Sequence, residues 1–383
     1  MKDNPYNAYF AKPFSLSAVV AKIKQTLVEL YPHLEIVKGL ELKSNEVKYS
    51  RVRIVHFLHF NTVNCDVYLR LSEGKFVKIL NKDELFSKEV LRKYTRKEVE
   101  YLYIEQTSFE NFSKMVLDYC KRSLEIDMCC LDALSGTSSL DAKVDAQVWG
   151  ISSIFEIANK LGLDPRMVEL TTVICNSTLD VLRNQSSIKG LLEKLIKSDN
   201  FLYQHSLLSV YIASAAATEM GWDERSTMEK LATAGILHDL SLERVSDSIK
   251  PENLEQFDII SDDQTIDRRV KKIIMNHPLD TYAMVKNATA FQDVDNIILH
   301  HHELPNGEGF PHKLSASQIP PLTCLFILAE TFARKIITKE INDDVVRELL
   351  LSFKKDYKQG NFRKPLEGLL SVFNHGRMTG SAR

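Results

Sequence analysis

The spacing of hydrophobic residues changes once along the chain and divides it into two parts. Between about 35 and 105, apolar residues alternate with polar ones over short runs such as 66–71, which is typical of strands. After about 145, apolar residues recur at intervals of three and four, as in 151–161 and 207–217, which is typical of amphipathic helices. The pattern therefore predicts an α+β N-terminal domain followed by an all-α helical bundle.

The clearest local prediction in the first part is a hairpin. Asp66–Leu71 and Phe76–Leu80 have the composition of strands, and the four residues between them include Gly74, as a tight turn requires. A helix near 88–94 and a strand at 100–105 extend this small domain. His56 and His59 lie in a stretch rich in β-branched and aromatic residues, and we expect them to occupy opposite faces of a strand rather than to form a metal-binding pair.

We predict five segments from these patterns. They are a loop and helix over 1–34, a small α+β domain over 35–125, a polar linker over 126–144, a helical domain over 145–373, and a mobile tail over 374–383. The α+β domain contains no cluster of histidines and acids after His59. We therefore expect the chemistry of this protein to be in the helical domain.

Composition limits the partners that the protein can have. A chain of 383 residues with a formal charge of −2 is long enough for two domains, but it lacks the excess of Lys and Arg that a general nucleic-acid binder needs. No apolar run approaches the roughly 20 residues of a membrane helix, and the N-terminus leads into no signal-type apolar segment. The six cysteines have no paired spacing, which is typical of reduced residues. We expect a cytoplasmic protein without membrane insertion and without a nucleic-acid polymer as partner.

Histidines and acids gather in the helical part, where seven of the eleven histidines lie between 205 and 312. The candidate ligands stand at or beside the ends of apolar helical segments: His205, His238, Asp239, His277, His301, His302 and Glu330. A single such histidine is usually a core residue, and a histidine run is often a solvated loop. Burying seven polar groups without partners would cost several kcal/mol each, so together they indicate a metal centre.

The donor set suggests the kind of metal centre. It contains imidazoles and carboxylates but no thiolate, which favours a hydrolytic or non-haem centre of Fe, Mn or Zn over a structural zinc site. Seven ligands exceed the number that one ion with an open position takes, so we expect two ions, with Asp239 able to bridge them through its two oxygens. Two such ions about 3.5–4 Å apart activate a bridging hydroxide and hold the oxygens of a phosphoryl group during in-line displacement. We expect His300 to face elsewhere.

The order of these residues resembles the HD superfamily of metal-dependent phosphohydrolases, and within it the HD-GYP branch. In that branch an H-D pair precedes a segment H-H-E-x-x-D-G-x-G-Y-P. Here the pair is His238-Asp239, and residues 301–311 read H-H-E-L-P-N-G-E-G-F-P. The similarity covers about 145–345 and includes Leu328-Ala329-Glu330, where the family has V-A-D. It implies a helical bundle with a di- or trinuclear iron or manganese site that hydrolyses cyclic di-GMP.

The resemblance also implies residue roles. All seven candidate ligands fall on family ligand positions, and Glu330 stands where the family has aspartate. His238 and Asp239 would be the catalytic pair, with Fe or Mn favoured over Zn. Phe201 occupies the position at which members with a third metal carry glutamate, so two ions are implied. The segment that would contact substrate contributes Asn306, Gly307, Gly309, Phe310 and Pro311.

Four residues differ from the family motif at positions that would lie near the substrate. Leu242 replaces the lysine of the family's H-D-x-G-K, Leu304 an arginine, Asn306 an aspartate, and Phe310 the signature tyrosine. Losing a phosphate-binding cation costs about 1.5–3 kcal/mol, roughly a ten- to hundredfold loss of affinity. Five cations are candidate replacements: Arg244, Lys271, Lys272, Arg334 and Lys339. Of these, we predict Arg334 and Lys339 as substrate-binding residues.

Three readings of function remain open from the sequence. The first is a dinuclear phosphodiesterase acting on cyclic di-GMP or a related phosphodiester. The second is a catalytically impaired receptor or scaffold in cyclic-dinucleotide signalling that retains the metal site, and the third is a metal-free signalling module of the HDOD kind. Residues 66–104 are similar to domains often found ahead of HD-GYP modules. This similarity implies a regulatory role, with a signalling protein or a second copy of the chain as candidate partner.

Overall fold

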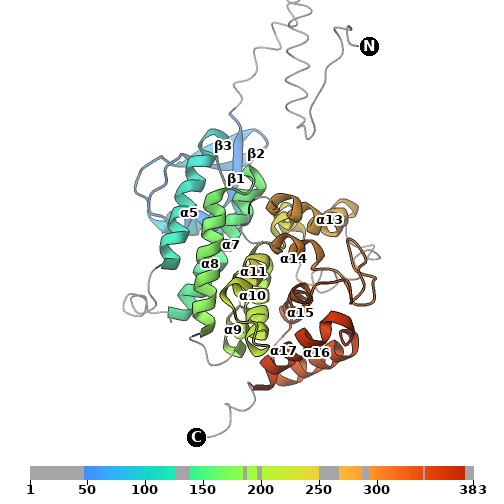
Figure 1. Cartoon of the computed structure of the whole chain (residues 1–383). Coiled ribbons are helices and arrows are strands. Elements are labelled where there is room, and N and C mark those ends of the chain that lie inside the picture. The colour runs from blue at the N-terminus through green and yellow to red at the C-terminus, as the bar shows by residue number, and fades with distance from the viewer. Residues whose placement is uncertain are drawn as a thin grey trace, which may run out of the picture. The chain divides into compact units, whose positions relative to one another are not determined.

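The computed structural model describes residues 47–125, 139–183, 188–195, 201–249, 267–286, 288, 293–339 and 341–375. It divides into two compact units, one ending at Phe109 and one beginning at Glu110, which we call the N-terminal unit and the helical unit (Figure 1). The helix expected within 1–34 and the tail after 375 lie outside the described residues. Among the helices so described, none has the length and apolarity needed to cross a membrane.

The N-terminal unit contains an antiparallel sheet with the strand order β1-β4-β2-β3. Its strands are β1 (Tyr49–Arg53), β2 (Val67–Ser72), β3 (Lys75–Leu80) and β4 (Tyr101–Glu105), and helix α4 (Lys88–Thr95) lies between β3 and β4 in the sequence. The predicted hairpin is confirmed as β2 and β3, and Gly74 between them has a φ of +76°, which favours glycine. The predicted α+β class of this part is thus confirmed.

The expectation for His56 and His59 is wrong. Strand β1 ends at Arg53, and a single helical turn, α3 (Ile54–Phe57), follows it. Ile54 and Phe57 are both buried, and their spacing of three suits a helical turn rather than a strand. Two residues three apart on a turn lie on the same side, so His56 and His59 are neighbours. Burial, with smaller effects from His56 and Lys88, lowers the pKa of His59 to about 4.

The helical unit begins one helix earlier than predicted. Helix α5 (Phe109–Glu125), which we assigned to the N-terminal domain, packs against α7 (Ser139–Leu161) of the helical unit. The rings of Tyr119 and Trp149 meet edge to face at 5.5 Å, and the Cys120 thiol lies 3.6 Å from the Ser153 hydroxyl. These two contacts join α5 to the helical unit.

The predicted linker is also too long. Helix α7 begins at Ser139, so 139–144 are helical, and 126–138 lie outside the described residues. Lys143 is buried and its ammonium donates to the backbone carbonyl of Leu124 at 2.5 Å, while Val144 is buried beside it. These contacts with the end of α5 explain why a polar stretch continues as helix.

Helix α10 (Phe201–Glu219) forms the core of the helical unit, as Figure 1 shows. It is apolar and buried on nearly all sides, as expected for a central helix. It packs against α15, α17, α11 and α7. The other elements are α8 (Pro165–Arg183), α9 (Ile188–Leu195), α11 (Arg225–Leu237), the 3-10 helix η2 (Leu240–Ser248), α13 (Arg268–Val285), α14 (Val294–His300), α15 (Pro321–Ile336), α16 (Asp343–Asp356), η4 (Gly360–Phe362) and α17 (Arg363–His375). The predicted helical bundle is confirmed.

Candidate metal centre

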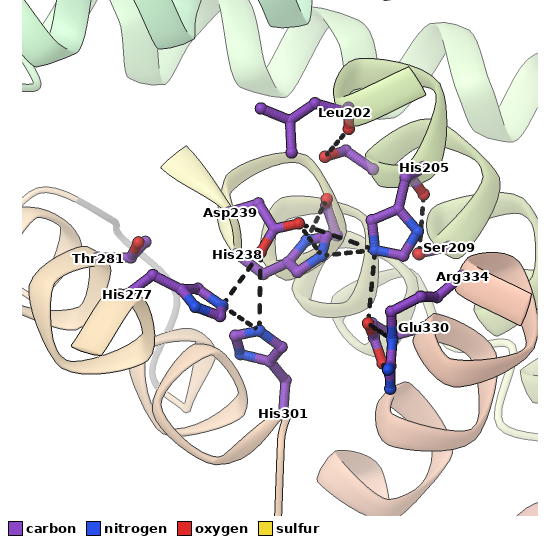
Figure 2. Close-up of polar contacts among 12 residues, drawn as sticks. Leu202, His205, Ser209, His238, Asp239, His277, Thr281, His301, Glu330 and Arg334 are labelled. Carbon is purple, nitrogen blue, oxygen red and sulfur yellow. Dashed lines mark hydrogen bonds and ion pairs between the residues drawn. The ribbon is translucent and has the colours of Figure 1, made fainter. Parts of the chain in front are cut away.

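The seven candidate ligands meet in the interior of the helical unit, and Figure 2 labels all of them except His302. His205 comes from α10, His238 and Asp239 follow the end of α11, His277 lies in α13, and Glu330 in α15. His301 and His302 follow the end of α14. None of the seven is more than 3 % exposed. The structure therefore brings together all seven side chains that the sequence pattern predicts as metal ligands, from five separate elements.

Within this cluster the donor atoms form two groups. The first, which we call the Asp239 group, comprises Asp239, His277, His301 and His302, and the second, the Glu330 group, comprises His205, His238 and Glu330. In each group the donor atoms lie within 4.8 Å of one another. The spacing is compatible with one metal ion in each group.

The Asp239 carboxylate joins the two groups. Its Oδ1 lies 3.2 Å from Nε2 of His277 and 3.8 Å from Nε2 of His301. Its Oδ2 lies 3.2 Å from Nε2 of His238 and 3.8 Å from Nε2 of His205. One oxygen thus faces each group, which is the arrangement of a bridging carboxylate.

Three of the histidines are oriented by their own backbone. The Nδ1 atoms of His238, His277 and His301 each lie against the carbonyl oxygen three residues earlier, at 2.9, 2.5 and 2.6 Å. A carbonyl only accepts, so each Nδ1 carries a proton and each ring turns its Nε2 toward the cluster, where that atom can bind a metal once it has no proton. Hydrogen bonds of this kind fix the tautomer and orientation of metal-binding histidines.

The accepting carbonyls are available because of where the helices end. His238 follows α11 and His301 follows α14, where the last carbonyls of a helix have no intrahelical partner. His277 lies inside α13, but Pro278 follows it directly. Because Pro278 has no N–H, the carbonyl of Ile274 four residues earlier lacks its usual helical donor and accepts from His277 instead. We did not single out Pro278 in the sequence, although a proline after a histidine in a helical pattern is a readable signal.

The lone pairs converge in a way that calls for a cation. The Nε2 atoms of His277 and His301 lie 3.0 Å apart, and those of His205 and His238 lie 3.2 Å apart. Both rings of the first pair donate through Nδ1, so in their neutral forms two lone pairs face each other. Burial and the neighbouring His238 and His277 hold the pKa of His301 well below its usual value, which disfavours a bridging proton. The donor set therefore fits a metal ion.

The two carboxylates of the cluster remain ionised. Burial raises the pKa of Asp239, but His238 and His277 outweigh it and hold that pKa well below the ordinary value. Burial likewise raises the pKa of Glu330, which Arg334, His205 and His302 bring well below its ordinary value. The cluster thus offers anionic oxygens beside the imidazoles, as a divalent cation requires.

Comparison with known proteins gives the family of this segment. Residues 190–341 match the family model of the HD domain. This segment is an HD domain. Among solved structures, Bd1817, described as an HDG"Y"P protein from Bdellovibrio bacteriovorus, has a similar fold: the TM-score is 0.54 at 17 % sequence identity, over 85 % of this chain and 100 % of that one. No curated protein sequence matches the chain.

The family-model match confirms the recognition of the HD domain, and the likeness to Bd1817 is one of fold. They also support assignment to the metal-dependent phosphohydrolases, to which the buried clusters of histidine and carboxylate conform.

After the ligands, the HD domain continues into a loop held by Glu303. This carboxylate is buried and accepts the backbone N–H of His312 at 2.7 Å and that of Leu314 at 2.8 Å. A Cβ at Gly309 would lie 2.3 Å from the backbone nitrogen of Leu304, so only glycine fits there. Glu303 therefore holds the loop in shape and, with both oxygens occupied, we do not assign it to the metal. The sequence pattern alone assigns no role to Glu303.

Phe310 brings this loop against the cluster. Its ring is stacked on that of His302, with centroids 4.8 Å apart, and meets His277 edge-on at 6.4 Å. Gly307 has a φ of +76°, and Asn306 is exposed, with its amide bonded to Glu308 at 2.6 Å. Gly309 is buried and Pro311 is partly exposed. The structure thus places Phe310 beside the ligands, whereas Asn306 lies at the outer edge of the loop.

His300 points away from the seven ligands, as expected. Its Nε2 lies 3.2 Å from Nδ1 of His312, an exposed residue of the same loop. The first of the three consecutive histidines, at the end of α14, thus contacts the loop and lies outside the metal centre.

The position of the family's lysine is occupied by a core residue. Leu242 is fully buried in η2. Beside it, Ser241 stands where the family has glycine, and its hydroxyl donates to the carbonyl of His277 at 3.2 Å while its N–H donates to the Thr281 hydroxyl at 3.2 Å. The segment after Asp239 therefore supports the helix that carries His277.

The five candidate cations are dispersed. Arg334 is buried, and its guanidinium contacts Glu330. Lys339 lies three residues after the end of α15 and is partly exposed. Arg244 is exposed and pairs with Asp280 at 3.4 Å. Lys271 and Lys272 lie in the first turns of α13. Of these, the structure places Arg334 at the cluster, and its contact there is a ligand carboxylate.

Proposed function

We propose that the HD domain of this protein is a phosphodiesterase that uses two divalent metal ions to hydrolyse cyclic di-GMP or a related phosphodiester. The observation that carries the proposal is the position of Asp239, which presents one carboxylate oxygen to each of two groups of buried donors. The HD domain and its likeness in fold to an HDG"Y"P protein support the reaction class.

In this proposal the residues divide the task between the two groups. Asp239, His277, His301 and His302 hold one ion, and His205, His238 and Glu330 hold the other, with Asp239 shared. The ions would be Fe or Mn, with Zn less favoured, because the donor set has no thiolate. Bound there, they would activate water for attack on phosphorus and neutralise the phosphoryl oxygens.

We propose that the substrate lies over the loop at 304–311. Phe310 is partly exposed and belongs both to this loop and to the wall of the metal centre. An aromatic ring at that place suits stacking on a nucleobase. Asn306, Gly307, Gly309, Phe310 and Pro311 remain the predicted substrate contacts, with Lys339 as a candidate cation. Arg334 was also a predicted substrate contact, but its guanidinium binds Glu330, and we propose a role for it at that ligand instead.

A second candidate function follows from the missing cation. Leu242 is buried where the family's lysine would stand, and Arg334 is bonded to Glu330. With both positions unable to reach a phosphate, the phosphodiester would be held less tightly in the transition state. These two observations favour a cyclic-dinucleotide receptor or scaffold that retains its metals. A regulatory N-terminal unit that contacts a signalling protein, and a homodimer, remain predictions.

One set of measurements separates the candidates. Full-length protein is purified anaerobically, its Fe, Mn and Zn are quantified, and cyclic di-GMP turnover and binding are measured on the same sample. His301→Gln removes a ligand, whereas His300→Gln removes the adjacent histidine outside the cluster and is the matched control.

The proposed phosphodiesterase predicts metal in the wild type and in H300Q, turnover in both, and loss of both properties in H301Q. Binding of cyclic di-GMP with metal present but without a linear product would establish the receptor instead. If the protein binds neither Fe, Mn nor Zn, both candidate functions are excluded and a metal-free signalling role is favoured.

A further inference from the structure

Arg334 is a buried cation in direct contact with a proposed metal ligand. It lies one helical turn after Glu330 on α15 and is 1 % exposed. Its Nε donates to Oε1 of Glu330 at 2.8 Å, and its Nη2 to Oε2 at 3.4 Å. The guanidinium thus lies alongside the carboxylate and engages both of its oxygens (Figure 2).

Arg334 binds the same Glu330 oxygen that faces His205, another ligand of the Glu330 group. Oε1 of Glu330 lies 3.5 Å from Nε2 of His205, and it is the same atom that accepts the shorter hydrogen bond from Arg334. An ion in the Glu330 group would therefore share this oxygen with a guanidinium. Charge-assisted hydrogen bonds of this geometry are the strong ones, so the two cations compete.

In the Asp239 group the carboxylate has different partners. The ion-pair contacts of Asp239 within the described part of the chain are to the four histidines 205, 238, 277 and 301. An imidazole gives up its second proton when it binds a metal, whereas a guanidinium keeps its charge. The Asp239 group is thus the better cation site, because its carboxylate partners can become metal ligands and the guanidinium beside Glu330 cannot.

Without a metal, Arg334 has a clear role. A buried carboxylate needs a counter-charge, since an unpaired one costs several kcal/mol. The guanidinium supplies that charge and contributes to the lowered pKa of Glu330. Its charge also reaches the other group, because after burial and His301 it is among the influences that lower the pKa of His302.

We propose that Arg334 is a built-in counter-cation that makes the two metal sites unequal. The Asp239 group fills first and tightly, and the Glu330 group fills second, weakly and exchangeably. This inference rests on the proposed dinuclear centre and adds a form of regulation to it. The two-metal state on which hydrolysis depends exists only when free metal is abundant, so metal supply controls activity.

The test is a stepwise titration of metal-stripped, full-length protein with Mn²⁺, followed by calorimetry and by electron paramagnetic resonance, which distinguishes a single Mn²⁺ from a coupled pair. In the wild type we expect two steps whose dissociation constants differ at least tenfold, with the uncoupled signal dominant after the first equivalent. Neither readout depends on activity.

Three variants test whether Arg334 causes the difference between the two dissociation constants. In Arg334→Met the second dissociation constant is expected to fall tenfold or more, while the melting temperature of the metal-free protein drops because Glu330 loses its counter-charge. Arg334→Lys keeps the charge without the two-point contact and is expected to lie between the two. Lys335→Met removes the next positive charge on α15, at a partly exposed position, and is expected to match the wild type.

The outcomes separate this inference from the proposed function. Two equal steps in the wild type, or a second step that is unchanged or weaker in R334M, would overturn the inference and leave the dinuclear centre intact. No Mn²⁺ binding at all would remove both. If R334M does not fold, the wild-type steps and R334K still decide.

Discussion

The ring of Phe310 lies nearly parallel to the imidazole of His302, with 4.8 Å between centroids and 16° between planes. The backbone N–H of Phe310 also donates to the carbonyl of His302 at 3.1 Å. Loop and ligand are therefore joined by two contacts at once. A change at position 310 acts on the metal centre as well as on any substrate.

Substitutions at Phe310 should distinguish the contribution of the aromatic ring from that of the hydroxyl group that a tyrosine would carry at this position. Phe310→Ala removes a stacked pair worth about 0.5–1.5 kcal/mol beyond its buried area, so we expect the melting temperature to fall by about 2–6 °C and chelators to strip metal faster. Phe310→Tyr keeps the ring and should retain both properties. Differential scanning fluorimetry and the rate of metal loss to EDTA measure this. Unchanged metal retention in F310A would show that the stacking is incidental.

Pro278 should matter for metal binding more than for folding. Pro278→Ala restores an N–H that can bond the carbonyl of Ile274 and so draw it away from Nδ1 of His277. Loss of such an orienting bond typically costs about ten- to a hundredfold in metal affinity. We expect weaker Mn²⁺ binding by isothermal titration, with a metal-free melting temperature no lower than that of the control. Leu279→Ala, at the exposed neighbouring position, is that control, and equal affinity in the two variants contradicts the argument.

Two glycines offer a matched pair. Gly309→Ala places a Cβ 2.3–2.6 Å from backbone atoms of Glu303 and Leu304, which cannot move aside as a side chain could. We expect a loss of about 1–3 kcal/mol or more in the free energy of unfolding. Gly190→Ala, in α9 with nothing near its Cβ, should gain about 0.5–1 kcal/mol. Urea denaturation of both variants checks the difference, and equal effects would argue against the close approach.

His59 should make the N-terminal unit sensitive to acid. Its pKa is about 4 when folded and near 6.5 when unfolded, so between these values the unfolded chain binds the proton more readily. Stability is unaffected above pH 6.5 and falls as the pH drops from 6.5 to 4, by up to about 3 kcal/mol.

Hydrogen exchange of the amides in β1 and β4, corrected for intrinsic rates, measures this loss on the full chain. His59→Gln should flatten the pH dependence, and His312→Gln, an exposed histidine of the helical unit, should not. A profile that is the same in H59Q and the wild type contradicts the assignment.

The metal centre was predictable to the extent that ligands end apolar helical segments. His205, His238, Asp239, His277, His301, His302 and Glu330 were recognisable because each interrupts a buried pattern, and the structure brings them together. The hydrogen bonds that position the ligands and the neighbouring loop were harder to predict from the sequence. The roles of Glu303, Ser241 and Arg334 depend on contacts with residues up to 40 positions away or on a partner one turn earlier.

The errors in the fold have local causes. The stretch after Arg53 is rich in strand-forming residues, but the burial of Ile54 and Phe57 selects a helical turn. At the domain boundary, the polar residues at 139–144 suggested a linker because a buried lysine bonded to a carbonyl cannot be recognised from sequence. In both places tertiary contacts override the local preference.

Three of the cluster histidines are held by carbonyls of their own helices, through the bonds at Gly235, Ile274 and Ile298. The direction of those rings is thus set by the backbone of the helices that carry them. Substitutions in the residues that would face a substrate, where they leave these helices and the Phe310 ring in place, would keep the three rings directed at the cluster. Substrate preference and metal binding can therefore vary separately in this domain.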